Sequence, residues 1–347
     1  MRPLNFFSFS ALGAMAAPPP SSPAYTPLYA VLPPTPNLPP ARFSGTAQIN
    51  NISLWYALYG APLPSSNGPK PPTSKTNAPI LLLHGVSPQL NASIPPTAHH
   101  PHLYPLLHQT TLTPTKGKIS SRWFTHQITH LTQSHPHTTI ITLDTRAHGR
   151  SADDLTVPLS YTLFASDAVA LLTHLSIPRA AIIGWSDGAN TALQMAMSYP
   201  SFVDRIFAFG ANYRADQLNV TGLMGIPFLA DLAGRMESEY KEVSATPGGY
   251  EVFEKRVDEM QAKLPDWGER EFGEIKTLFE EPRTAPVVWV VDGAEEEVVQ
   301  RRVPGEIRDM IAGSGLVLLP DVGHFAPLQD PGTFNAMLDR WLARERG

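Results

Sequence analysis

The chain has 347 residues, of which 42% are hydrophobic and 16% charged, and its formal net charge is −5. This length accommodates one large α/β domain or two small ones, and the hydrophobic content suits a globular enzyme with a sizeable core. The absence of cysteine excludes disulfides, thiolate zinc sites, iron–sulfur clusters and a cysteine nucleophile. No apolar run reaches the ~18 residues of a spanning helix, so we predict no membrane span.

Charged residues are unevenly distributed along the chain. Residues 1–143 contain no Asp or Glu, whereas residues 144–347 carry all 31 acidic side chains against 19 basic ones. The basic residues of the first part are scattered among Pro, Ser and Thr, whereas a nucleic-acid-binding face clusters them. We therefore expect no nucleic-acid partner.

Residues 1–44 are predicted to be a signal-like or disordered, Pro-rich segment. An early arginine, an apolar middle and small residues at Ala14–Ala17 resemble a short secretory signal, although polar residues interrupt the apolar stretch. Residues 17–41 hold ten prolines, which is typical of a linker or tail. The composition leaves a secreted and a cytoplasmic location both open.

The pattern changes in the domain predicted from residue 45 onward. Apolar and polar residues alternate on both sides of Asn50-Asn51, which predicts a hairpin. The apolar run of residues 78–85 is typical of a strand buried on both faces of a parallel sheet. Between about residues 87 and 121 we predict a Pro/His-rich insertion. It lacks the Asp, Glu or Cys that would complete a metal site, so we expect a solvated loop and no metal.

Beyond the insertion, apolar strand-like runs alternate with segments of helical spacing, which predicts a mostly parallel, doubly wound sheet. The segment of about 214–280 lacks strand character and is helical and charged. We predict that it forms a cap, inserted before the last two strands, over the carboxyl edge of the sheet, where ligands bind in such folds. The expected strands are 138–144, 179–185, 203–210, 285–293 and 315–319, and the expected helices are 160–175, 189–197, 304–312 and one from 331.

The strongest local motif is Gly184-Trp185-Ser186-Asp187-Gly188, between an apolar strand and a helix. This G-x-S-x-G context is that of a nucleophile elbow, a tight turn that pushes the serine hydroxyl into the cleft. The glycines are required because side chains there would clash with the neighbouring strand and helix. We predict Ser186 as the nucleophile and the Asp187 N–H as one oxyanion donor.

A serine hydroxyl needs a base, and the base needs a carboxylate to orient it. His324 follows the last apolar strand and completes the chain order of serine, acid and histidine. For the acid, Asp292 and Glu296 both lie near the end of the preceding strand, and physical reasoning alone leaves both open. The Val86 N–H, after His84-Gly85, is the second candidate oxyanion donor, and His84 itself is expected to be structural.

Six separated segments together resemble the α/β-hydrolase superfamily, in its single-domain serine-hydrolase branch. The resemblance implies an α/β-hydrolase fold over residues 45–347, a helical cap, no cofactor and the roles given above to Ser186, His324, Val86 and Asp187. In that branch the acid follows a glycine by three residues, so the resemblance favours Glu296, although Asp is typical there. Val86 stands where a second glycine is common. The six segments are LLLHGV, DTRAHGRS, GWSDGAN, VDRIFAFGANY, VVDGAEEEVV and LPDVGHFAPLQDP.

Some relatives open epoxides or remove halides, and they use a carboxylate nucleophile at the elbow. Serine at this position therefore disfavours both reactions. We therefore expect a cofactor-independent hydrolase of carboxylic esters or related small acyl substrates, acting through an acyl-enzyme. Lactone or carbon–carbon bond hydrolysis is one alternative, and a non-catalytic ligand-binding member of the same fold is another. The fold supports many reactions, so the substrate and the oligomeric state do not follow from it.

Overall fold

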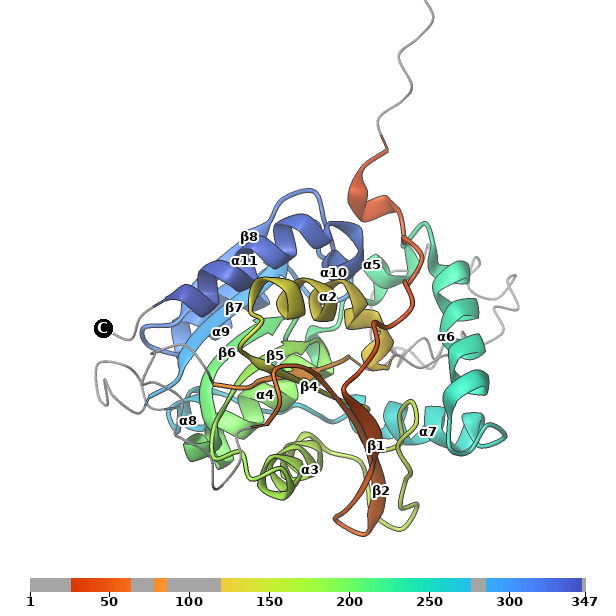
Figure 1. Ribbon diagram of the computed structural model, residues 1–347. Coiled ribbons are helices and arrows are strands. Elements are labelled where there is room, and N and C mark those ends of the chain that lie inside the picture. The colour runs from red at the N-terminus through yellow and green to blue at the C-terminus, as the bar shows by residue number, and fades with distance from the viewer. Residues whose placement is uncertain (1–25, 64–77, 86–119, 276–284, 345–347) are drawn as a thin grey trace, which may run out of the picture.

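The computed structural model describes residues 26–63, 78–85, 120–275 and 285–344 (Figure 1). Their strands form one eight-stranded sheet in the order β1-β2-β4-β3-β5-β6-β7-β8. β2 is antiparallel to both of its neighbours, and all other pairs are parallel. The mostly parallel sheet is as predicted. The strands are β1 (Phe43–Ile49), β2 (Ile52–Gly60), β3 (Ile80–Leu83), β4 (Thr139–Leu143), β5 (Ala180–Trp185), β6 (Val203–Phe209), β7 (Val287–Gly293) and β8 (Gly315–Leu319).

Helices cover both faces of this sheet. α2 and α11 lie side by side on one face, and α3 and α4 pack together on the other (Figure 1). This is the doubly wound arrangement that the alternating pattern predicts. The helices are η1 (Leu28–Ala30), η2 (Ser121–Phe124), α2 (Thr125–Ser134), α3 (Tyr161–His174), α4 (Asp187–Ser198), η3 (Pro200–Phe202), η4 (Ala215–Gln217), α5 (Val220–Met224), α6 (Leu229–Val243), α7 (Tyr250–Gln261), α8 (Glu269–Phe272), α9 (Val303–Met310), α10 (Ala326–Gln329) and α11 (Pro331–Ala343).

The continuous apolar runs form the central strands. Every residue of β3, β4, β5 and β7 is buried, whereas burial alternates along the edge strand β8. The hairpin of β1 and β2 turns at Asn50 and Asn51, whose φ angles of 46° and 65° fall in the left-handed region that asparagine tolerates. Because β3 to β8 are parallel, their carboxyl ends lie at one edge of the sheet, where the candidate residues follow them.

Helices α5 to α8 are inserted between β6 and β7, and so before the last two strands. Of these, α5, α6 and α7 lie beside the sheet, with α6 running along its outside, whereas α8 lies apart from them (Figure 1). Phe228, which precedes α6, packs edge-on against the ring of Phe325 at 5.5 Å. A second apolar cluster joins Phe253 and Val257 of α7 to Tyr161 of α3. Of the predicted cap, residues 276–280 lie outside the described residues.

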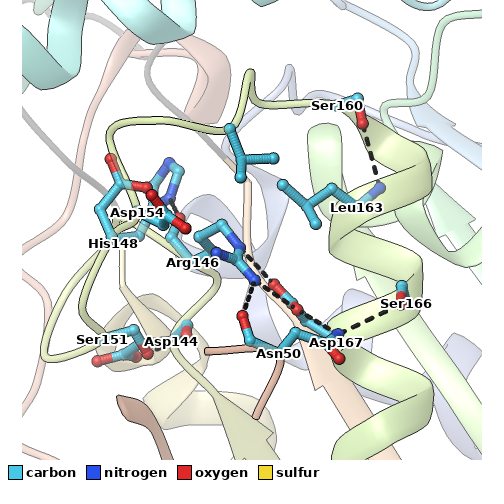
Figure 2. Close-up of polar contacts among 12 residues, drawn as sticks. Asn50, Asp144, Arg146, His148, Ser151, Asp154, Ser160, Leu163, Ser166 and Asp167 are labelled. Carbon is cyan, nitrogen blue, oxygen red and sulfur yellow. Dashed lines mark hydrogen bonds and ion pairs between the residues drawn. The ribbon is translucent and has the colours of Figure 1, made fainter. Parts of the chain in front are cut away.

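The turn of the hairpin is fastened to α3 by a buried ion pair. The Arg146 guanidinium donates to both carboxylate oxygens of Asp167 at 2.8 and 2.9 Å, and it also donates to the carbonyl of Asn50 (Figure 2). α3 begins at a standard cap, in which Ser160 Oγ accepts the N–H of Leu163 (Figure 2). These contacts position the antiparallel edge of the sheet.

Residues 27–42, which we call the N-terminal strap, differ from the disordered segment expected there. The strap contains η1 and packs on the core, with Leu32 only 5% exposed. Its carbonyls accept hydrogen bonds from side chains more than 200 residues away in the sequence. Such contacts leave no periodic pattern, which explains why proline content alone indicated a tail. Residues 1–25, with the signal-like stretch, lie outside the described residues.

Most of the predicted Pro/His-rich insertion, residues 87–119, lies outside the described residues. Of its end, Ser120 and Ser121 are buried. Among the described residues no group of three or more His, Asp or Glu side chains could hold a metal ion. In the same part of the chain, no helix is both long and apolar enough to cross a membrane.

Candidate active site

Ser186 lies at the sharp turn between β5 and α4. Its φ and ψ angles of 57° and −121° are a conformation that a non-glycine residue adopts only under strain, as at a nucleophile elbow. A Cβ on Gly188 would come within 2.0 Å of the Leu83 carbonyl oxygen, and one on Gly184 within 2.4 Å of the Gly188 carbonyl oxygen. The two glycines therefore permit the turn by letting α4 approach β3 and β5.

The loop after β3 lies against the elbow. A Cβ on Gly85 would meet the Ser186 Cβ at 3.0 Å, so the backbone before residue 86 runs directly beside the serine. His84 is fixed in one tautomer, because its Nε2 accepts the Thr145 N–H at 3.0 Å and its Nδ1 donates to the Gly85 carbonyl. This is the structural role expected of His84. Val86 itself lies outside the described residues.

His324 follows β8 in a loop that brings it to Glu296. Its Nδ1 lies 2.9 Å from Oε1 and 3.1 Å from Oε2 of the Glu296 carboxylate. The same Oε1 accepts the N–H groups of Val298 and Val299 at 2.7 and 2.9 Å, so the carboxylate is held from both sides. Both side chains are buried. Glu296, and not Asp292, therefore contacts the imidazole.

The end of β6 brings the serine and the histidine into one neighbourhood. The Ser186 N–H donates to the Phe209 carbonyl at 2.7 Å. The next residue, Gly210, packs so closely on the imidazole that a Cβ there would lie 2.7 Å from His324 Cε1. The ring of Trp185, adjacent to the serine, lies 6.4 Å from the imidazole centre. The structure thus brings together Ser186, His324 and Glu296 at one edge of the sheet.

The pKa values of the two candidate acids are shifted in opposite directions because their surroundings differ. Burial alone would raise the pKa of Glu296, but the charge and hydrogen bond of His324, with those of Asp292 and the Val299 N–H, lower it to about 2. Burial and the neighbouring charge of Glu296 raise the pKa of Asp292 well above its usual value. Glu296 is therefore the anion at neutral pH, whereas the surroundings of Asp292 favour its protonated form. The Oδ1 of Asp292 accepts the N–H of Gly293 at 2.8 Å.

The imidazole itself titrates above its usual range. Burial alone would lower the pKa of His324, but the carboxylates of Glu296, Glu297 and Asp187 raise it. Glu297 adds a further contact, because its Oε2 accepts the backbone N–H of His324 at 2.9 Å. Burial and the charge of Glu296 raise the pKa of Glu297 to about 7. Glu297 is therefore not a solvated loop charge but a contact of the His324 backbone, 27 residues away in the sequence.

Asp187 contributes a buried side chain as well as its backbone. Its Oδ1 accepts from the Tyr161 hydroxyl, and its Oδ2 accepts from Gln261 Nε2 at 2.8 Å. Burial and the Asp187 carboxylate raise the pKa of Tyr161 well above its usual value. Gln261 ends α7, so the inserted helices contact the residue next to Ser186. These partners lie 26 and 74 residues from Asp187, and no local motif indicates them.

The apolar residues expected to line a pocket have different surroundings. Leu223 and Phe228 are buried, and Phe228 packs on Phe325, the residue after His324. Met224 and Leu229 are partly buried. A separate cavity of about 760 Å³ lies between the N-terminal strap, η2 and α6, and neither Ser186 nor His324 lines it. The lining of a substrate pocket by these cap residues remains a prediction.

Comparisons with known proteins agree with this architecture. The family described as the alpha/beta hydrolase family matches residues 80–337. The serine hydrolase BPHL of Homo sapiens is 30% identical over 214 residues, which cover 59% of this chain and 69% of that protein. A meta-cleavage product hydrolase from Pseudomonas fluorescens is similar in structure, with a TM-score of 0.59 and 13% identity over 87% of this chain and 97% of that one. An enol-lactonase from Burkholderia xenovorans gives a TM-score of 0.54 and 17% identity over 86% and 100% of the two chains.

The family match spans most of the chain, from β3 to α11. The similar structures share the sheet and its flanking helices, and the relatives named here are hydrolases. The chain therefore belongs to the alpha/beta hydrolase family.

Proposed function

We propose that the protein is a serine hydrolase of carboxylic esters or related small acyl compounds, with Ser186 as nucleophile, His324 as base and Glu296 as acid. One observation carries this proposal, the 2.9 Å contact of His324 Nδ1 with the buried Glu296 carboxylate beside the strained serine turn. A carboxylate at Nδ1 fixes the tautomer in which Nε2 can accept a proton. It also stabilises the imidazolium that then forms.

The reaction follows from these contacts. Ser186 Oγ attacks the acyl carbonyl carbon and its proton passes to His324 Nε2, which gives a tetrahedral intermediate. The intermediate collapses when His324 protonates the leaving alcohol, which leaves an acyl-enzyme on Ser186. Water then attacks the acyl carbon and gives its proton to His324. Expulsion of Ser186 Oγ, reprotonated by His324, releases the carboxylic acid.

The developing oxyanion needs donors that are in place before the reaction. We assign this role to the backbone N–H groups of Asp187 and Val86. Asp187 is the first residue of α4, so the positive end of the helix dipole adds to its N–H. Val86 follows Gly85, whose backbone runs beside Ser186. Each such donor contributes roughly 10²–10³ to turnover in other serine hydrolases.

A screen of p-nitrophenyl esters with increasing acyl length tests the proposal. We expect release of p-nitrophenol by the wild type at a rate far above that of S186A, which retains the fold and lacks the nucleophile. A lactone and a vinylogous 1,5-diketone are included, since lactone opening and carbon–carbon cleavage use the same nucleophile and base. Turnover of the lactone or diketone alone would replace the ester assignment, and absence of turnover for every compound would favour the ligand-binding alternative.

A further inference from the structure

The loop that carries His324 is held at two consecutive backbone N–H groups. The Gly323 N–H donates to Gln329 Oε1 at 2.9 Å, and the His324 N–H donates to Glu297 Oε2 at 2.9 Å. Both acceptors are side chains, one from α10 and one from the loop after β7. These two side chains therefore hold the backbone of the candidate base, and both bonds end on backbone N–H groups and not on the imidazole.

The fit around this loop is close. A Cβ on Gly323 would lie 1.9 Å from Glu297 Oε2, so the glycine is required for the carboxylate to reach the backbone. Asp321, two residues earlier, has a φ of 59°, a conformation that surrounding contacts must maintain. The geometry of this strained turn therefore depends on the side chains of Gln329 and Glu297 that bind its backbone.

Gln329 also binds a segment at the other end of the chain. Its Nε2 donates to the carbonyls of Tyr29 and Val31 in the N-terminal strap, at 3.2 and 3.3 Å. The strap returns a bond to the loop, because the Tyr29 N–H donates to the Asp321 carbonyl at 3.0 Å. Gln329 is only 5% exposed, so water does not readily replace these partners.

The strap continues from this loop to the inserted helices. Arg235 of α6 donates to the carbonyls of Leu32 and Pro33 at 2.8 and 2.5 Å. The side chain of Leu32, which follows the residues bound by Gln329, is buried in the main core. One short stretch of the strap therefore joins the loop of the candidate base to α6.

We propose that Gln329 is a positioning residue for His324, and that it acts by fastening the Gly323–His324 backbone to the N-terminal strap. This inference rests on the proposed function, because it concerns the base of that reaction. Loss of the Gln329 amide would let the loop shift relative to Ser186. Small displacements of a catalytic group lower turnover strongly while the substrate still binds, because alignment is lost.

The test compares three full-length variants by the rate at which a fluorophosphonate labels Ser186. Q329M removes both hydrogen-bonding functions at similar volume, and Q329E keeps an acceptor for the Gly323 N–H. Q127M is the matched control, because buried Gln127 donates to the Pro327 carbonyl of the same short helix at 3.1 Å, and its Oε1 makes no hydrogen bond among the described residues. Labelling is normalised to the folded fraction measured by circular dichroism. Should Q329M fail to fold, Q329N replaces it, since it withdraws the amide by one methylene.

We expect Q329M to label on the order of 10-fold more slowly than wild type, with kcat lowered and KM little changed on any ester that is turned over. Q329E keeps the acceptor for the Gly323 N–H but loses the donor to the strap carbonyls, so it should also label more slowly than wild type. Q127M should label normally even if its melting temperature falls. Wild-type labelling rates in both Q329M and Q329N, or an equal loss in Q127M, would overturn the inference and leave the proposed function standing. An absence of labelling in the wild type would overturn both.

Discussion

Two loops at the same edge of the sheet bury charged side chains, and they balance the charge differently. After β4, each buried carboxylate has a guanidinium: Arg150 Nε lies 2.6 Å from Asp144, and Arg146 Nε lies 2.8 Å from Asp167. Burial alone would raise the pKa of Asp144, but the charge and hydrogen bonds of Arg150 lower it. Asp144 therefore stays ionised near neutrality. The contacts of both acids fasten the hairpin, η2 and α3 together (Figure 2).

At the ends of β7 and β8, three carboxyl groups are clustered: Glu296 contacts the His324 imidazole, Glu297 contacts the His324 backbone N–H, and Asp292 interacts with Glu296. Glu296 has a pKa of about 2, Glu297 one of about 7, and the pKa of Asp292 lies well above its usual value. Among the ion pairs of the described residues, none joins an arginine to these three carboxyl groups, and Glu296 is paired with His324. Neighbouring acids whose environments separate their pKa values are typical of proton-transfer sites, whereas matched ion pairs are typical of structural ones. Both regions bury their carboxyl groups, so burial does not distinguish the candidate site. What distinguishes it is that its carboxyl groups lack, within the described part of the chain, the arginine partners found after β4.

The largest expected effect is the loss of the nucleophile or the base. S186A and H324A should each lower kcat by about 10⁴–10⁶, and the double variant should be little worse, because the two groups act as a unit. Steady-state kinetics on the best ester measure this. Losses that multiply in the double variant would show that the residues act independently.

The next largest effect on kcat distinguishes the two candidate acids, Glu296 and Asp292. E296Q should lower kcat by about 10³–10⁴, because an amide at Nδ1 favours the wrong imidazole tautomer. D292N should cost far less, because Glu296 and not Asp292 contacts the imidazole, and Asn can still accept the Gly293 N–H. Comparison of kcat for the two variants measures this. The reverse ranking would move the acid to Asp292 and leave the hydrolase proposal intact.

Substitution in the Arg146–Asp167 ion pair should lower the free energy of unfolding and leave catalysis nearly unchanged. R146M leaves the Asp167 carboxylate buried without its guanidinium, which costs about 3–5 kcal/mol in the free energy of unfolding. Urea denaturation measures this cost, and kcat per folded molecule should remain near that of wild type. In the double variant R146M/D167L much of the stability should return. A large fall in kcat of folded R146M would mean that the two clusters are not separate in function.

The smallest effect is on the pH profile. His324 acts as a base only when neutral, and its pKa is raised, so kcat/KM should rise with pH with a midpoint above 6.5. E296Q removes the anion that raises this pKa, so the residual activity should have its midpoint at lower pH. Profiles of both enzymes on one ester check the sign. A midpoint that moves upward in E296Q would contradict the assigned electrostatics.

Local patterns in the sequence predicted much of the fold. The Asn50-Asn51 turn, the continuous apolar runs and the inserted helices each have a periodic or turn signature, and each is present as an element. α2 was not predicted, because Thr125–Ser134 is rich in threonine and histidine and follows directly on the insertion. The N-terminal strap was not predicted either, because its order depends on Gln329 and Arg235, which lie far away in the sequence.

Some residues of the candidate site have a local signature in the sequence, and others depend on contacts with distant residues. Ser186 and His324 stand in motifs with a fixed relation to a strand end, so the sequence indicates them directly. The choice between Asp292 and Glu296 depended on the family resemblance, since the reach of two nearby carboxylates is a matter of loop geometry. Glu297, Gln329 and Tyr161 were not indicated, because their roles are contacts with backbone or side chains that no spacing rule describes.

The central claim is that Ser186 is a nucleophile activated by His324 and Glu296. The most direct measurement is mass spectrometry of the protein after reaction with a fluorophosphonate, followed by peptide mapping. We predict one adduct per chain on Ser186, none in S186A, and much slower formation in H324A and E296Q than in D292N. An unmodified Ser186 in folded wild-type protein, or equal labelling of wild type and H324A, would contradict the claim.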